Sequence, residues 1–147
     1  MKKLLCPVEL EIFGADTSTC LPLIMAGSAV KAGFPSPADD FVEQKIDLNV
    51  HLIQHPAATF FARVKGQSMV CAGIDEGDLL VVDRAVEPKS GNIAVCFVDG
   101  EFTIKRIKVD NECCYLVAEC DGFQPIRVDS SNEFVVWGVV TYVIKKL

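Results

Sequence analysis

Runs of β-branched and aromatic residues, separated by Gly, Pro, Asp and Asn, dominate the chain from residue 59 onward. Such side chains favour extended backbone, and turn-forming residues mark the places where strands end. The pattern predicts strands at 59–64, 79–83, 92–98, 101–107, 115–118, 126–128 and 134–144. The fold class is therefore predicted to be mainly β.

The clearest turn signal in the chain is Asp99-Gly100, which separates two of these runs. An Asp-Gly pair suits a tight turn that needs positive φ, so the flanking runs are predicted to form a β-hairpin. Lys105 lies in the second strand of that hairpin, in phase with Thr103 and Ile107 and out of phase with Arg106. Lys105 is thus the lysine predicted to face inward, although periodicity alone leaves a solvent-exposed strand lysine open.

The first third of the chain has a different pattern. Residues 1–32 show no sustained period, and the prolines of Phe34-Pro35-Ser36-Pro37 hold the residues before them extended. This part is predicted to be an extended, flexible N-terminal arm. Apolar residues separated by charges between 38 and 54 predict one or two short helical turns.

Length and composition narrow the function classes. The chain has 147 residues and a formal net charge of −6, which suit a single globular domain and disfavour strong direct DNA binding. No apolar run approaches the roughly 18 residues that cross a bilayer, so no membrane association is expected. Seven cysteines without a C-x-x-C pair indicate neither a disulfide framework nor a zinc site. We expect a cytoplasmic protein with reduced thiols, no metal and no cofactor.

Ser68 follows the predicted strand 59–64, in the segment Lys65-Gly66-Gln67-Ser68-Met69. A serine beside a glycine is usually a turn residue, and its hydroxyl is a weak nucleophile until a base accepts its proton. A lysine can be that base if burial keeps its amine neutral, which makes Lys105 a candidate. Neither His51 nor His55 is expected to be catalytic, but spacing alone leaves open a triad that uses Asp78 or Asp83.

Three linked motifs resemble the UmuD/LexA family of self-cleaving proteins: Gly66-Gln67-Ser68-Met69, then 77–83 (GDLLVVD), then 99–106 (DGEFTIKR). Serine and lysine are separated by 105 − 68 = 37 positions, as the serine–lysine dyad of the family requires. The resemblance implies twisted, partly barrel-like sheets with a β-hairpin that carries the lysine. It also implies that Ser68 is the nucleophile and Lys105 its general base.

Residues 32–44, which include Ala32-Gly33 and Phe34-Pro35-Ser36-Pro37, resemble the cleavage-site region of the UmuD branch. The resemblance places the cleavage site between Ala32 and Gly33. It divides the chain into an arm, residues 1–32, that self-cleavage removes, and a serine–lysine peptidase-like domain, residues 33–147. An arm this short cannot hold the helix-turn-helix domain of LexA-like repressors, which favours the UmuD branch.

The resemblance also implies a role in the SOS response. The protein would be a homodimer whose autoproteolysis is stimulated by a RecA nucleoprotein filament, and its processed form would be an accessory subunit of a UmuC-like Y-family translesion polymerase. Three alternatives remain open at this stage. These are a non-cleaving docking or regulatory module, a phage or plasmid regulator on the same fold, and a peptidase that acts on other proteins. The last of them normally needs a membrane anchor.

Overall fold

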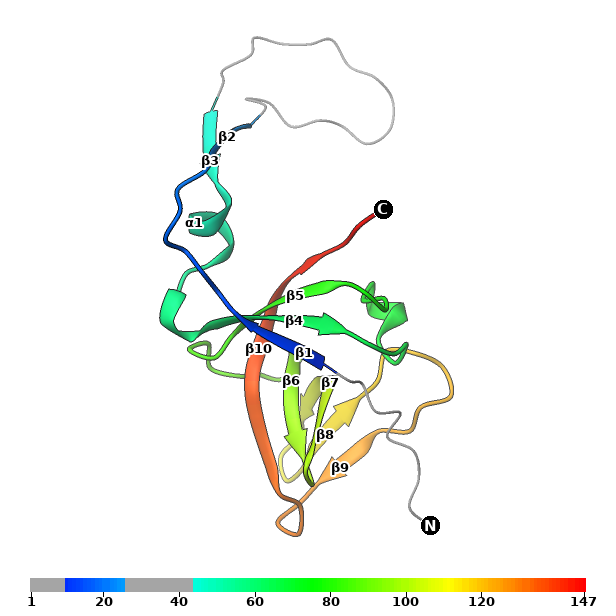
Figure 1. The fold of residues 1–147 in the computed structure, drawn as a ribbon. Helices are drawn as coiled ribbons and strands as arrows, with labels where there is room; N and C mark the ends of the chain where they lie inside the picture. Colours follow the sequence, from blue (N-terminus) through cyan, green and yellow to red (C-terminus); the bar gives the residue numbers. More distant parts are fainter. Residues whose placement is uncertain (1–9, 26–43) are drawn as a thin grey trace.

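A large antiparallel sheet forms the body of the protein in the computed structural model, which describes residues 10–25 and 44–147 (Figure 1). Its eight strands lie in the order β1-β4-β5-β10-β6-β7-β8-β9. Their bounds are β1 Leu10–Gly14, β4 Thr59–Val64, β5 Leu79–Asp83, β6 Ile93–Val98, β7 Glu101–Val109, β8 Cys114–Val117, β9 Ile126–Val128 and β10 Phe134–Ile144. The predicted mainly β fold is confirmed, with each predicted strand within two residues of its expected bounds. The sheet is open and not closed into a barrel, because β1 and β9 form its two ends.

A second, two-stranded sheet pairs β2 (Pro22–Met25) with β3 (Gln44–Asp47) and projects from one end of the large sheet (Figure 1). Short helices complete the fold: α1 (Leu48–Leu52), η1 (Pro56–Ala58) and η2 (Val70–Ala72). The described part of the chain contains no helix that is long and apolar enough to cross a membrane.

The segment before β4 differs in part from the prediction of helical turns. Helix α1 is confirmed, and it begins where the Asp47 carboxylate accepts a hydrogen bond of 2.9 Å from the Asn49 amide. Residues 44–47 are instead a strand, because β2 supplies the backbone partners that a sequence pattern cannot reveal. The predicted arm also differs, since β1 and β2 hold two parts of it in sheets.

The predicted hairpin is confirmed in β6 and β7, which pair from Val98↔Glu101 to Ile93↔Arg106. At the turn, φ is 47° at Asp99 and 91° at Gly100. Two consecutive residues with positive φ match the right-handed twist of the flanking strands. The hairpin therefore carries Lys105 into the middle of the large sheet.

Buried side chains gather in two clusters on the large sheet. One cluster contains Ala62, Val64, Met69, Ile74, Leu80, Val82, Val95 and Ile104, and the other contains Ala94, Cys96, Val98, Ile107 and Leu116. Met69 is only 2% exposed, so the residue next to Ser68 is fixed in the first cluster.

Strand β10 joins two halves of the large sheet. Its first part pairs with β6 and its second part with β5, and Val139 has a partner on each side, Ala94 and Asp83. The register shifts twice along β10, between Val136 and Gly138 and again between Val140 and Tyr142. Such bulges bend a strand and increase its twist, which lets one long strand follow two neighbours in turn.

Candidate active site

Ser68 lies in a tight turn between β4 and η2. Gly66, with φ of 103°, turns the chain out of β4 in a conformation that favours glycine. The end of β4 is held to the start of β5 by hydrogen bonds of 3.0 Å from the Val64 amide to the Asp78 carbonyl and 2.8 Å from the Gly77 amide to the Val64 carbonyl. Ser68 itself is 2% exposed. The turn therefore holds a buried hydroxyl on an anchored backbone.

Lys105 reaches this hydroxyl from β7. Its Nζ lies 3.0 Å from Ser68 Oγ, 2.9 Å from Thr103 Oγ1 and 3.0 Å from the Ile104 carbonyl oxygen. The lysine is 5% exposed, so the expectation that it faces inward is confirmed. Thr103 and Ile104 are also buried, in agreement with a strand that is covered on both faces at this point.

The arrangement has the chemistry of a nucleophile and a base. A distance of 3.0 Å permits direct proton transfer between the serine oxygen and the lysine nitrogen. Burial disfavours the charged form of an amine, and a neutral amine is the form that accepts a proton. The hydroxyl and carbonyl oxygens around Nζ fix the direction of its lone pair and its hydrogens.

Sequence reasoning missed Thr103 and the Ile104 carbonyl as contacts of the amine. Thr103 lies two residues before Lys105, on the same face of β7, so strand periodicity does place it beside the lysine stem. The threonine hydroxyl at position 103 was therefore the feature of the sequence that could have indicated this contact. No signal in the sequence pointed to the carbonyl contact, because it depends on how the side chain folds back along its own strand.

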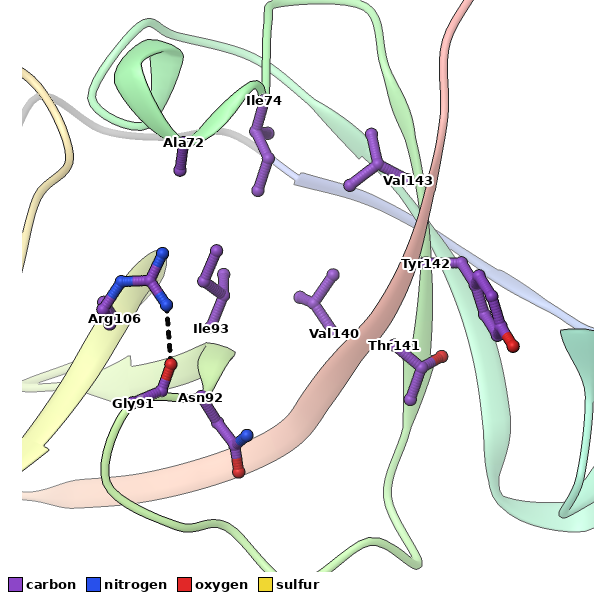
Figure 2. Close-up of a pocket in the computed structure, with 10 residues that line it drawn as sticks. All are labelled: Ala72, Ile74, Gly91, Asn92, Ile93, Arg106, Val140, Thr141, Tyr142 and Val143. Carbon is purple, nitrogen blue, oxygen red and sulfur yellow. Dashed lines mark hydrogen bonds between the residues drawn. The ribbon is translucent and has the colours of Figure 1, made fainter. Parts of the chain in front are cut away.

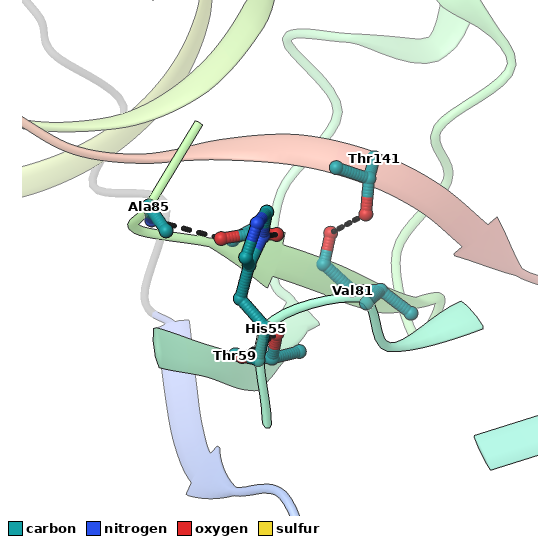
Figure 3. A network of polar contacts seen from close by, with 6 residues as sticks. His55, Thr59, Val81, Ala85 and Thr141 are labelled. Carbon is teal, nitrogen blue, oxygen red and sulfur yellow. Dashed lines mark hydrogen bonds and ion pairs between the residues drawn. The ribbon is translucent and has the colours of Figure 1, made fainter. Parts of the chain in front are cut away.

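The alternative triad is not supported by the structure. His55 Nδ1 lies 2.6 Å from Asp83 Oδ2, and Figure 3 shows His55 beside Thr59, whose hydroxyl donates a 2.7 Å hydrogen bond to the His55 carbonyl. The His55–Asp83 pair lies at the start of β4, whereas Ser68 follows the end of β4. At about 3.3 Å per residue the strand alone separates the two places by roughly 16 Å.

Asp78, the other candidate carboxylate, is engaged elsewhere. Its Oδ2 accepts hydrogen bonds of 2.8 Å from the Asp75 amide and 2.5 Å from Lys145 Nζ. The pKa of Lys145 is raised by its hydrogen bonds to Asp75 and Asp78, which favour its charged form. Asp78 therefore holds the loop before β5 to the end of β10.

A cavity of about 270 Å³ is lined by residues from the segments that carry Ser68 and Lys105. Figure 2 shows Ala72 and Ile74, which follow the serine turn, on one side, and Arg106, the neighbour of Lys105, on another. Arg106 Nη1 donates a 2.6 Å hydrogen bond to the Gly91 carbonyl, and its Nε is paired with Glu119. The cavity therefore has a lining of mixed polar and apolar residues, with a hydrogen-bonded and ion-paired arginine at its edge.

Two predicted features fall outside the described residues, namely the Ala32-Gly33 bond and the boundary between the arm and the domain at that bond. Within residues 10–25 and 44–147, no group of three or more His, Cys, Asp or Glu side chains could hold a metal ion.

Comparison with known proteins agrees with the motifs. Residues 22–141 match the family model described as Peptidase S24-like. The chain is 45% identical to Protein ImpA of Salmonella typhimurium over 132 residues, which cover 89% of this chain and 88% of that protein. It is 37% identical to Protein MucA of Escherichia coli over 139 residues, 92% and 93% of the two chains.

The LexA repressor of Colwellia psychrerythraea is 39% identical over 126 residues, which cover 85% of this chain and 58% of the repressor. The resemblance to the UmuD/LexA family is therefore confirmed. The chain belongs to the Peptidase S24-like family of serine peptidases.

Proposed function

We propose that this protein is a self-cleaving serine endopeptidase of the SOS response, in which Ser68 and Lys105 cut the Ala32-Gly33 bond of the chain's own arm. The observation that carries the proposal is the buried 3.0 Å contact between Lys105 Nζ and Ser68 Oγ. A serine and a lysine in contact away from solvent have few structural uses, because a buried lysine is costly unless its amine is neutral or well paired.

The proposed reaction has two halves. Neutral Lys105 takes the proton of Ser68 as Oγ attacks the Ala32 carbonyl carbon, with the Ser68 amide as the donor that we assign to the oxyanion. The protonated lysine then gives its proton to the Gly33 nitrogen as the peptide bond breaks, which leaves Ala32 as an ester on Ser68. Water, deprotonated by Lys105, hydrolyses that ester and returns Ser68 to its starting form.

The biological context that we propose follows from the resemblance to the UmuD branch. The resting protein is a cytoplasmic homodimer, and a RecA nucleoprotein filament accelerates its cleavage. The processed form, residues 33–147, then acts as an accessory subunit of a UmuC-like, error-prone Y-family polymerase. The single cut is a switch, because it changes which partners the same domain can hold.

Intact mass spectrometry tests the proposal. The protein is incubated at alkaline pH, where more of any lysine amine is neutral, and separately with RecA, an ATP analogue and single-stranded DNA. We expect two fragments that end at Ala32 and begin at Gly33. Ser68→Ala and Lys105→Ala are expected to stay whole, whereas Lys108→Ala, which removes an exposed lysine of the same strand, is expected to cleave like the wild type.

Three outcomes would contradict the proposal. A wild-type chain that stays whole under both conditions would favour a non-cleaving docking module. Cleavage at another bond would refute the Ala32-Gly33 site. Cleavage that persists in both Ser68→Ala and Lys105→Ala would refute the dyad.

A further inference from the structure

We propose that the edge of β4 is a binding site for an extended peptide strand, and that β1 of the arm stays bound there after the Ala32-Gly33 bond is cut. This inference rests on the proposed self-cleavage. It concerns whether the arm stays bound after the cut, which is a separate question from whether Ser68 and Lys105 make the cut.

The backbone of β1 is an integral strand of the large sheet. It is antiparallel to β4 over five residue pairs, from Leu10↔Val64 to Gly14↔Phe60, and lies along β4 in Figure 1. One edge of β4 is paired with β5, so β1 occupies the remaining edge of β4. A peptide that adds a strand to a sheet edge in this way gains its affinity from main-chain hydrogen bonds.

Side chains on one face of β1 match basic groups on β4. Glu11 carboxylate oxygens lie 3.9 Å from Arg63 Nε and 3.8 Å from Lys65 Nζ. The Arg63 guanidinium also lies 5.8 Å from the centre of the Phe13 ring, within the range of a cation–π contact. An acidic residue followed two positions later by an aromatic residue is therefore the pattern that this edge fits.

The opposite face of β1 contacts the core. Leu10 packs against the cluster that includes Ala62 and Val64, which are 0% and 3% exposed. Burial of an apolar side chain stabilises a bound strand in addition to its hydrogen bonds. The strand Leu10-Glu11-Ile12-Phe13 thus contacts the core through Leu10 and the basic groups of β4 through Glu11 and Phe13, while Ile12 is exposed.

The position of the proposed cut breaks none of these contacts. β1 and β2 both precede Ala32, and their partners β4 and β3 both follow Gly33. β2 pairs with β3 over four residue pairs, and the Asn49 side-chain amide donates a 2.8 Å hydrogen bond to the Thr19 carbonyl. Cutting the chain turns these contacts from intramolecular to intermolecular but leaves all of them in place.

The arm is therefore a bound ligand of the processed domain and is not released by hydrolysis itself. Its departure requires dilution or a competing strand that carries an acidic residue two positions before an aromatic one. The β4 edge becomes available only when β1 leaves.

The test uses two preparations of cut protein. One is wild type after self-cleavage. The other is Ser68→Ala with a recognition sequence for an added site-specific protease inserted between Ala32 and Gly33, which is cut whether or not the dyad works. Size-exclusion chromatography and native mass spectrometry, both at micromolar concentration, then show whether the arm fragment remains with the domain. We expect the fragment to co-elute in both preparations.

Glu11→Lys places a cation beside Arg63 and Lys65, and we expect it to weaken retention of the fragment about tenfold. Asp16→Lys makes the same charge change at an exposed residue outside β1 and is expected to retain the fragment like the parent chain. A fragment that leaves the unsubstituted domain immediately after the added protease cuts would overturn the inference, as would equal retention in the two charge variants. If wild type fails to cut itself, the proposed function fails, and the second preparation still decides the fate of the arm.

Discussion

The hydroxyl of Thr103 gives the sharpest test of how the site works, because it contacts the proposed base and nothing in the reaction requires it to bond to substrate. Its Oγ1 lies 2.9 Å from Lys105 Nζ, and the residue is 2% exposed. Thr103→Val keeps the branched shape of the side chain and removes only the hydrogen bond. The substitution therefore asks how much the positioning of the amine contributes to self-cleavage.

The expected magnitude follows from the number and type of bonds that hold the amine. One buried hydrogen bond contributes about 1 kcal/mol net, which corresponds to roughly a fivefold change in rate. We expect the first-order rate of self-cleavage on its alkaline plateau to fall about fivefold in Thr103→Val. Thr103→Ser keeps a hydroxyl at the same place and should stay within about twofold of wild type.

The pH dependence of the rate separates positioning from loss of structure. A hydroxyl oxygen that accepts from an ammonium stabilises the charged form of the lysine, so its removal should move the midpoint of the rate profile to lower pH. Intact mass spectrometry over a series of pH values measures both the plateau and the midpoint, and a thermal melt checks the fold. If Thr103→Val and Thr103→Ser have the same plateau and the same midpoint, the reasoning is refuted.

Three further predictions concern the rest of the sheet. Gly138→Ala would place a Cβ 2.6 Å from Val82 Cγ1, so we expect the free energy of unfolding in urea to fall by about 1–3 kcal/mol. Adding Val82→Ala should restore part of this loss. An unchanged free energy of unfolding in Gly138→Ala would refute the clash. Burial raises the pKa of Cys96 to about 12, so an alkylating reagent at pH 8 should label the exposed Cys71 and leave Cys96 unlabelled. Cys96 should react only when the pH rises toward that value or when the chain unfolds. Peptide mass mapping measures the labelling of each cysteine. His55→Ala should self-cleave at the wild-type rate, and a large decrease with an unchanged melting temperature would reopen the triad.

The strands that sequence reasoning predicted are those whose signal is local. The hairpin of β6 and β7 carries its own turn chemistry in Asp99-Gly100, and β4 and β5 are dense in residues that suit an extended, buried backbone. A period of two favoured the inward orientation of Lys105 but left a solvent-exposed strand lysine open. Its contact with Ser68 required the family resemblance, because Ser68 lies in the turn after β4, and β4 and β7 are not neighbours in the sheet.

The features that were not predicted depend on partners distant in the chain. β1 has the short, mixed sequence Leu10-Glu11-Ile12-Phe13, which becomes a strand because β4 offers it an edge. Residues 44–47 lie in the range 38–54, where one or two short helical turns were expected, and they are extended for the same reason, with β2 as the partner. The contact between His55 and Asp83 likewise exists only after β4 and β5 have paired.

The pairing of β10 with both β5 and β6 has a consequence for how the protein folds during its synthesis on the ribosome. Ser68 belongs to the half of the large sheet that contains β4 and β5, and Lys105 belongs to the half that contains β6 and β7. β10 lies between these halves and is translated after every other described strand. Before β10 leaves the ribosome, β4 can pair with β5 and β6 can pair with β7, but β5 and β6 still lack the strand that joins the two halves in the sheet. The order of synthesis therefore leaves the joining of the two halves through β10 until last.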